Sequence, residues 1–120
     1  MSIQYLLDEH IPPLYRTQIV RRESSLIVRI IGDPDAPAKG TLDPAILIWC
    51  EFHNFILVTN NRKSMPKHLE DHLTEGRHIP GIFVIDPTQS IGQIIEELLI
   101  IAGASNDDEY QDRIEYLPLS

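Results

Sequence analysis

Oxygen-bearing side chains come directly after several apolar runs of this sequence. Asp8 and Glu9 follow one run, Asn60 and Asn61 follow another, and Asp43 opens a third. Carboxylate and amide oxygens are the ligands that hard cations such as Mg²⁺ prefer. A divalent ion held by such groups can polarise a phosphodiester and activate a water molecule. These residue types therefore indicate metal-assisted phosphoryl chemistry, with Asp8, Asp43 and Glu9 as candidate metal ligands.

Each acid also has an ordinary structural explanation. A carboxylate directly after a buried strand, as at Asp8, is held with little freedom, but Asp is also a common turn residue. For Glu9, a solvated surface acid is the more ordinary explanation. Asp43 precedes Pro44 in the pattern of a helix N-cap followed by proline at the first helical position. Because an N-cap lies at the positive end of a helix, Asp43 can serve both roles.

The segment Asn60-Asn61-Arg62 adds amide groups and a cation beside these acids. Asn61 can act as a neutral oxygen ligand or orient a water molecule. Arg62 is suited to bidentate contact with phosphate, and Asn60 stands next to it as a second candidate for substrate binding. A plain polar loop would use the same residues, because Asn tolerates left-handed backbone angles. The candidate catalytic residues are Asp8, Asp43 and Asn61.

Other catalytic signatures are missing. His68 and His72 stand four residues apart in HLEDH, which differs from the HExxH of zinc peptidases. Cys50 lies in an apolar run and is predicted to be buried, so no third zinc ligand is evident. The sequence contains no GxxxxGK[ST], no GxGxxG and no GxSxG. It therefore lends no support to nucleotide triphosphatase, dinucleotide-binding or serine hydrolase chemistry.

The segments that must position these residues alternate between strand and helix. Apolar runs rich in β-branched residues predict strands over 3–7, 26–31, 55–59 and 81–85, with 114–119 as a further candidate. Helical spacing predicts helices over 12–23, 43–52, 64–76 and 90–103. This order is typical of a three-layer α/β/α sandwich with a mainly parallel sheet. Ligands of such sheets bind at the carboxyl ends of the strands, which is where the candidate residues lie.

Length and composition indicate one domain. The chain has 120 residues, of which 42% are hydrophobic, and a single cysteine, so it forms no internal disulfide. It has no apolar run of about 20 residues and no recognisable signal peptide, so we expect a cytoplasmic location and no membrane contact. We divide it into a domain over 1–104 and an acidic tail over 105–120. The net charge of −8 argues against nucleic-acid binding through phosphate neutralisation alone.

The chain resembles the compact PIN-like proteins of bacteria. The matching pieces are YLLDEHIPP, the Gly-rich loop leading to LDPAIL, ILVTNNR and PGIFVID, in the family's order over roughly residues 4–100. The resemblance implies a parallel sheet between helices. It also implies an endoribonuclease that cuts RNA with Mg²⁺ or Mn²⁺ held by a cluster of acids, often as the toxin of a toxin–antitoxin pair. RNA and an antitoxin or other protein are the partners that it implies.

By this resemblance, Asp8 matches the first acid of the cluster and Asp43 an inner one. Asn61 stands where the family has an aspartate, and Lys63 stands where another acid often follows. Because affinity for a hard cation depends on ligand charge, these two changes should weaken metal binding. Two hypotheses therefore stay open. The chain is either a metal-dependent ribonuclease or a catalytically weakened PIN-like module that binds a protein or RNA without cleaving it.

Two further possibilities concern ligands and self-association. A domain that binds phosphate ligands through Arg62 and the helix ends is a third function, although no motif singles it out. Small domains of this kind often pair, so a homodimer is possible, with Trp49 either in the core or at the interface.

Overall fold

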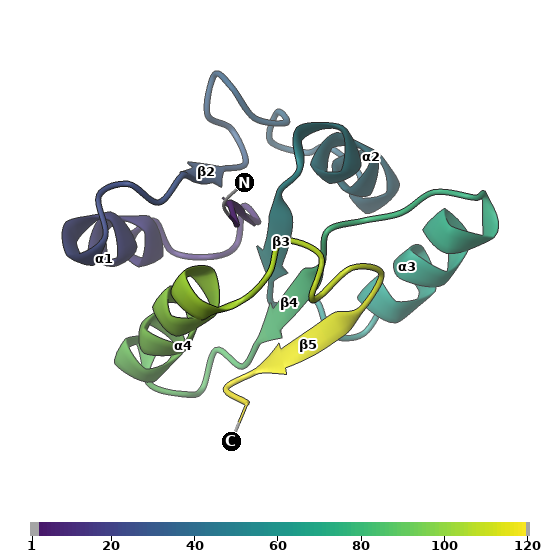
Figure 1. Ribbon diagram of the computed structural model, residues 1–120. Helices are drawn as coiled ribbons and strands as arrows, with labels where there is room; N and C mark the ends of the chain where they lie inside the picture. The colour runs from purple at the N-terminus through teal and green to yellow at the C-terminus, as the bar shows by residue number, and fades with distance from the viewer. Residues whose placement is uncertain (1–2, 120) are drawn as a thin grey trace.

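Five short strands form one parallel sheet in the computed structural model, which describes residues 3–119 (Figure 1). The strands are β1 (Tyr5–Leu7), β2 (Val28–Ile30), β3 (Ile56–Thr59), β4 (Ile82–Ile85) and β5 (Ile114–Leu117). The helices are α1 (Leu14–Arg22), α2 (Asp43–His53), α3 (Met65–Thr74) and α4 (Ile91–Ala104). The predicted α/β class is confirmed, and the arrangement is that of a three-layer sandwich with a parallel sheet.

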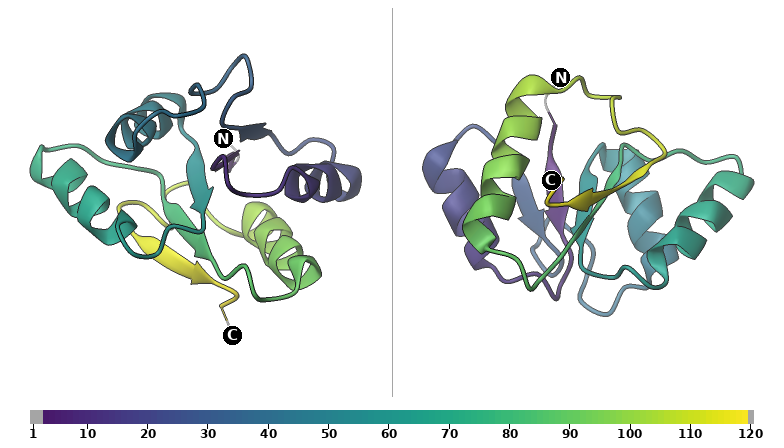
Figure 2. Two further views of the ribbon diagram at one scale, coloured as in Figure 1. Left: turned by 180° about the vertical axis from the view of Figure 1, so that it is seen from behind. Right: turned by 90° about the horizontal axis from the view of Figure 1, so that it is seen from below.

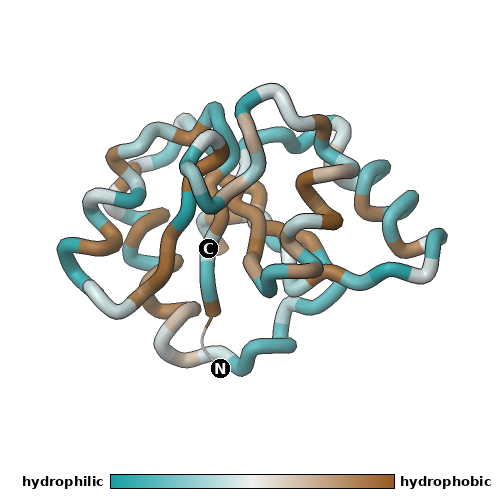
Figure 3. Tube along the Cα trace, turned by 90° about the horizontal axis from the view of Figure 1, so that it is seen from above, coloured by the Kyte–Doolittle hydropathy of each residue, from teal (hydrophilic) through white to brown (hydrophobic). Residues whose placement is uncertain are grey.

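The helices cover both faces of the sheet in pairs. Helices α1 and α4 pack on one face, and α2 and α3 pack on the other (Figures 1 and 2). Successive side chains of a strand point to opposite faces, so Leu6 faces the α2/α3 layer while Tyr5 and Leu7 face the α1/α4 layer. The apolar part of the trace gathers toward the middle of the molecule (Figure 3). This division explains why β1 and β4, which lie inside the sheet, are apolar at every position.

One buried hydroxyl joins the sheet to the α1/α4 layer. The Tyr5 side chain is fully buried, and its hydroxyl donates a hydrogen bond of 2.7 Å to the Leu98 carbonyl of α4. Burial raises the pKa of this phenol far above its ordinary value, and the nearby Tyr110 adds to the effect. The hydroxyl therefore stays protonated and available as a donor.

The strand order is β2-β1-β3-β4-β5, and it places a change of winding direction between β1 and β3. The chain leaves β1 toward β2 on one side, then crosses back to β3 on the other side. At such a point the connections after the two neighbouring strands diverge, and ligands of open parallel sheets bind there. The residues that follow β1 and β3 are therefore placed where the sheet edge is most open.

Helix α2 begins differently from the sequence prediction. The predicted N-cap, Asp43, is instead the first helical residue, and Leu42 occupies the cap position without a side-chain hydrogen bond. Pro44 lies in the first turn, as its fixed backbone angle predicts. The capping prediction was wrong because the Asp43 carboxylate accepts a hydrogen bond from another segment of the chain, Asn61, rather than from its own helix.

The last segment of the chain completes the sheet at its edge. Strand β5 pairs in parallel with β4, and the loop before it packs against the residues around β4. The Tyr110 ring meets the Phe83 ring edge-on, with centroids 5.1 Å apart. A Cβ atom at Gly81 would lie 3.1 Å from the Tyr110 Cβ, so the close approach needs glycine. Within residues 3–119, no helix has the length and apolar character needed to cross a bilayer.

An ion pair holds the loop before β5 to the start of β4. Asp112 Oδ2 lies 2.7 Å from His78 Nδ1, and Asp112 Oδ1 accepts a hydrogen bond from the Ile79 N–H. The Asp112 hydrogen bond and charge raise the pKa of His78 above 6.5. Partial burial alone would raise the pKa of Asp112, but the hydrogen bonds from His78 and Ile79 lower it.

We expect Asp112→Asn to return the pKa of His78 toward 6.5. The pair contributes stability that is fully present below the ordinary His pKa and is lost as pH rises through the raised pKa. The wild-type protein should therefore lose stability across this range, and the variant should lose less. Asn also tolerates the left-handed backbone at this position, where φ is 60°. NMR titration of the His78 ring and urea unfolding at several pH values measure both effects. An unchanged His78 titration would contradict the pairing.

Candidate functional site

Asp8 and Thr59 meet at the carboxyl ends of β1 and β3. The Thr59 hydroxyl donates a hydrogen bond of 2.7 Å to Asp8 Oδ2, and the Glu9 N–H donates one of 2.8 Å to Asp8 Oδ1. The backbone N–H of Asp8 also donates to the Val58 carbonyl, so the ladder between β1 and β3 continues into the loop. Asp8 and Thr59 are both buried. The carboxylate of Asp8 is thus fixed in orientation at the change of winding direction.

Asp8 also takes part in a turn, which is the other role that its residue type predicted. The Ile11 N–H donates a hydrogen bond of 3.0 Å to the Asp8 carbonyl. This bond closes a turn immediately after β1. The turn uses the main chain of Asp8, while the side chain faces Thr59. Its structural role therefore leaves the carboxylate at the sheet edge.

Asn61 joins Asp43 to this group. Its amide Nδ2 donates to Asp43 Oδ2 at 3.0 Å and to Ser64 Oγ at 2.7 Å. Its Oδ1 accepts from the Ser64 N–H, and its own backbone N–H donates to the Thr59 hydroxyl. An uninterrupted chain of hydrogen bonds therefore runs from Asp8 through Thr59 and Asn61 to Asp43. The structure brings the three predicted catalytic residues to one edge of the sheet.

The neutral amide at Asn61 determines the electrostatics of this edge. Both of its hydrogen-bond donations can be made only by an amide, since an ionised carboxylate has no hydrogen to donate. Asp43 therefore has a neutral donor at 3.0 Å, and the imidazole Nε2 of His68 lies 3.4 Å from the same oxygen. An aspartate at position 61 would instead place two carboxylates in contact, an arrangement that favours a bound cation or a proton.

The Cys50 thiol beneath the site is not part of its chemistry. It is fully buried on α2, as the sequence predicted. Burial raises the pKa of the thiol far above its ordinary value, and the negative charge of Asp8 raises it further. A protonated, buried thiol is a poor nucleophile and a poor metal ligand.

Glu9 is directed to a different segment. Its exposed carboxylate accepts a hydrogen bond of 3.0 Å from the Gly40 N–H, in the loop before α2. Among residues 3–119, no three His, Cys, Asp or Glu side chains lie close enough together to hold a metal ion. The structure therefore does not assemble the predicted set of Asp8, Asp43 and Glu9 as one group. Asp8, Asp43 and the amide of Asn61 are linked to one another instead.

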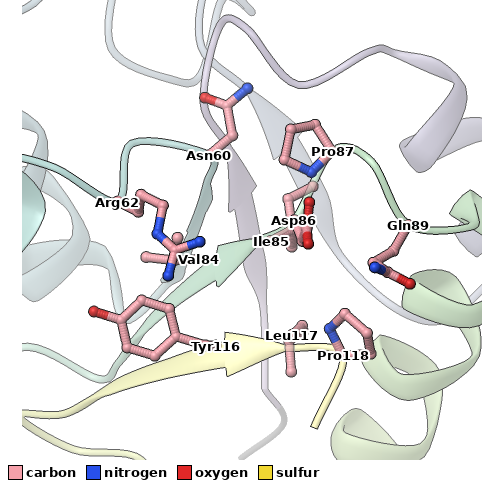
Figure 4. Close-up of a pocket in the computed structure, with 10 residues that line it drawn as sticks. All are labelled: Asn60, Arg62, Val84, Ile85, Asp86, Pro87, Gln89, Tyr116, Leu117 and Pro118. Atoms are coloured by element: carbon pink, nitrogen blue, oxygen red, sulfur yellow. The ribbon is translucent and has the colours of Figure 1, made fainter. Parts of the chain in front are cut away.

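A cavity of about 330 Å³ lies beside these residues, over the ends of β4 and β5 (Figure 4). Both predicted substrate-binding residues, Asn60 and Arg62, line it. The Arg62 guanidinium carbon lies 5.8 Å from the centre of the Tyr116 ring of β5. Asp86, which follows β4, lines the other side of the cavity. Hydrogen bonds from the Thr88 hydroxyl and N–H lower the pKa of Asp86, and the charge of Arg62 adds to this, so the carboxylate is ionised.

The two histidines of HLEDH do not share a site. His68 approaches Asp43 at the carboxyl edge. His72 is buried, and its Nε2 lies 2.9 Å from the His78 carbonyl and 3.2 Å from Glu51 Oε1. Consecutive turns of α3 thus serve two different purposes. The His72 contacts join α3 to α2 and to the segment before β4.

Several residues that complete the site were not predicted from the sequence. Thr59 stood in the predicted strand as an ordinary β-branched residue, and its position just before a polar loop was the only available signal. Ser64 marked a helix start, and Tyr116 fell in the segment assigned to the tail. Nothing in the local sequence indicates that Tyr116 lies beside Arg62, because the two are brought together by the pairing of β5 with β4.

Comparisons of the chain with models of protein families, with curated proteins and with solved structures found no match. The geometry of the carboxyl edge and the residue pattern are therefore the basis for a functional proposal.

The hydrogen bond from Thr59 gives a direct test of this geometry. We expect Thr59→Val to lower the free energy of unfolding by about 1–3 kcal/mol, because a buried carboxylate oxygen loses its donor. Thr59→Ser keeps the hydroxyl and should lose less stability than Thr59→Val. Urea unfolding of the two variants measures the difference. Equal stability of the valine and serine variants would mean that the Asp8 carboxylate does not depend on this bond.

Proposed function

We propose that this chain is a PIN-like metal-dependent endoribonuclease whose site lies at the carboxyl edge of the sheet, between β1 and β3. One observation supports this proposal above the others. The hydrogen-bonded chain of Asp8, Thr59, Asn61 and Asp43 gathers two carboxylates and an amide from three separate segments at the place where parallel sheets bind ligands.

The proposed donors are of the type that a single hard cation takes. Mg²⁺ in phosphoryl-transfer sites is commonly held by one or two carboxylates, with substrate phosphate oxygens and waters completing its coordination. Asp8 and Asp43 would be the charged ligands. Asn61 turns its Nδ2 toward Asp43 and its Oδ1 toward the Ser64 N–H, so it would orient the attacking water rather than bind the ion. Mn²⁺ accepts the same oxygen donors. When bound, such an ion polarises the phosphodiester and lowers the pKa of a coordinated water.

The residues around the two acids would position the carboxylates and the RNA. The Thr59 hydroxyl and the Glu9 N–H hold the Asp8 carboxylate in one orientation, so little ordering is left to occur when RNA binds. Asn61 keeps Asp43 at the same edge. Arg62 and Asn60 border the neighbouring cavity and would bind the RNA beside the acids. The overall charge of −8 makes these local contacts, rather than a broad basic surface, the means of binding.

A second function has its own supporting observation. The amide of Asn61 already satisfies Asp43 without any cation, and it adds no charge. A site with two carboxylates attracts a divalent ion less strongly than one with three or four. The alternative is therefore a weakened PIN-like module that binds an RNA or a protein such as an antitoxin at this edge without cutting. Either function is compatible with a homodimer that pairs through the surface around the half-buried Trp49.

The nuclease proposal predicts that purified protein cuts single-stranded RNA in the presence of Mn²⁺ and that Asp8→Asn lowers the rate at least about 100-fold. Loss of outer-shell partners costs about 10–100-fold in metal sites, and Asp8 is proposed as a direct ligand. Asp71→Asn is the matched control, because it removes the same charge from an exposed pair with Lys67 on α3. Cleavage that persists in Asp8→Asn would remove Asp8 from the mechanism.

The two functions make different predictions for Asn61→Asp. A third carboxylate should raise the affinity for Mn²⁺, and in metal-free buffer it should lower the free energy of unfolding by about 1–3 kcal/mol, because Asp43 loses its donor. Calorimetry with Mn²⁺ and urea unfolding measure the two effects. Binding by both the wild type and the variant supports the nuclease. Binding by the variant alone, with no binding to the wild type at millimolar Mn²⁺, supports the weakened module.

A further inference from the structure

The cavity beside the acids has walls of opposite charge. Arg62 and Asn60 line one side, and Asp86 and Gln89 line the other (Figure 4). Tyr116 lies next to the Arg62 side chain (Figure 4). These residues follow or belong to β3, β4 and β5, so three neighbouring strand ends build the cavity. Its volume of about 330 Å³ is in the range of pockets that bind small organic ligands.

The acidic wall is fixed in orientation. Asp86 Oδ1 accepts hydrogen bonds from the Thr88 N–H at 2.9 Å and from the Thr88 hydroxyl at 2.7 Å. The carboxylate is ionised, as described above, and it belongs to the cavity lining. These two bonds fill Oδ1, so the fixed carboxylate presents its other oxygen, Oδ2, as the acceptor for a ligand.

The basic wall combines a flat cation with an aromatic ring. The Arg62 guanidinium lies over the Tyr116 ring, 5.8 Å from its centre, and Tyr116 is 47% exposed. Within residues 3–119, Arg62 has no ion-pair partner within 4 Å, so its donors are available to a ligand. Guanidinium planes and aromatic rings are the surfaces on which proteins stack unpaired RNA bases.

Guanine is the base that complements both walls. Its N1–H and N2–H₂ groups are adjacent donors that can converge on one oxygen of an ionised carboxylate. Its O6 and N7 atoms are adjacent acceptors that match the fork of an arginine. Adenine offers an acceptor at N1 that would face the carboxylate, and uracil and cytosine lack a pair of adjacent donors of this kind. The opposite charges of Asp86 and Arg62 therefore select for guanine.

We propose that the cavity formed by Asn60, Arg62, Asp86, Gln89 and Tyr116 is a guanine-binding site. Asp86 Oδ2 accepts from the base N1–H and N2–H₂, Arg62 donates in the plane of the base to O6 and N7, and the exposed part of the Tyr116 ring provides the stacking surface. The inference rests on the proposed function in one respect, which is that the guanine would belong to RNA bound at the same edge. The recognition chemistry is the same for a guanine nucleotide that is free in solution.

The test is titration of the ¹⁵N-labelled full chain with guanosine and adenosine 5′-monophosphates in EDTA. We expect amide shifts confined to residues 60–62, 84–89 and 116–118 and an affinity about tenfold higher for the guanosine nucleotide. Asp86→Asn should abolish this preference, and Asp71→Asn should keep it. Tyr116→Ala should weaken binding of both nucleotides about tenfold, through loss of stacking. Equal affinities in the wild type, no binding at millimolar nucleotide, or shifts elsewhere would overturn the proposal.

Oligonucleotides distinguish the source of the base. A single-stranded RNA with one guanine should bind more tightly than the same RNA with adenine at that position, and Asp86→Asn should remove the difference. A guanine preference in the mononucleotide but not in the RNA would assign the cavity to a free nucleotide. EDTA removes divalent ions, so the result does not depend on cleavage. If Asp8→Asn still cuts RNA but the guanine preference is present, the nuclease proposal alone is rejected. If Asp8→Asn abolishes cleavage but no guanine preference is found, the guanine site alone is rejected.

Discussion

The hydrogen bond from the Thr59 hydroxyl to the Asp8 carboxylate joins the ends of β1 and β3 at the place where the chain changes its winding direction. Helices leave these two strands toward opposite layers, so the edge between them is not covered by a crossover. A buried carboxylate is costly unless it is hydrogen-bonded, and here both oxygens have donors from the chain. The arrangement of the other polar groups at this edge follows from that pair, because Asn61 bonds to the same hydroxyl and then to Asp43.

The two edges of the sheet use polar groups in different ways. At the amino edge, His72, Glu51 and Asp112 pair with main-chain and side-chain partners and join neighbouring segments to one another. At the carboxyl edge, the hydrogen-bonded acids stand beside an open cavity whose charged walls, Arg62 and Asp86, do not form an ion pair within 4 Å. Polar groups that satisfy one another stabilise a fold, whereas charges left apart around a cavity are suited to a ligand.

Asn61 determines the charge of the site. It lies at the edge where the candidate acids gather, but its side chain is neutral. Its donation to Asp43 holds the loop after β3 against the start of α2, which an ionised carboxylate could not do without a cation. The amide therefore contributes hydrogen bonds within the site but no negative charge. The nuclease proposal and the neutral Asn61 side chain point in opposite directions for catalysis, and the affinity of the edge for a divalent ion decides between them.

The sequence by itself determined the alternation of strands and helices and placed Asp8, Asp43 and Asn61 at one edge, because apolar runs and the residues that end them are local features. It could not determine that Asn61 bonds to Asp43 or that the Asp43 carboxylate turns away from capping, since these contacts join segments 18 residues apart. The cavity beside the acids depends still more on tertiary structure. Arg62 meets Tyr116 only because β5 pairs with β4, and the order of strands is set by how the two helical layers pack rather than by any single segment.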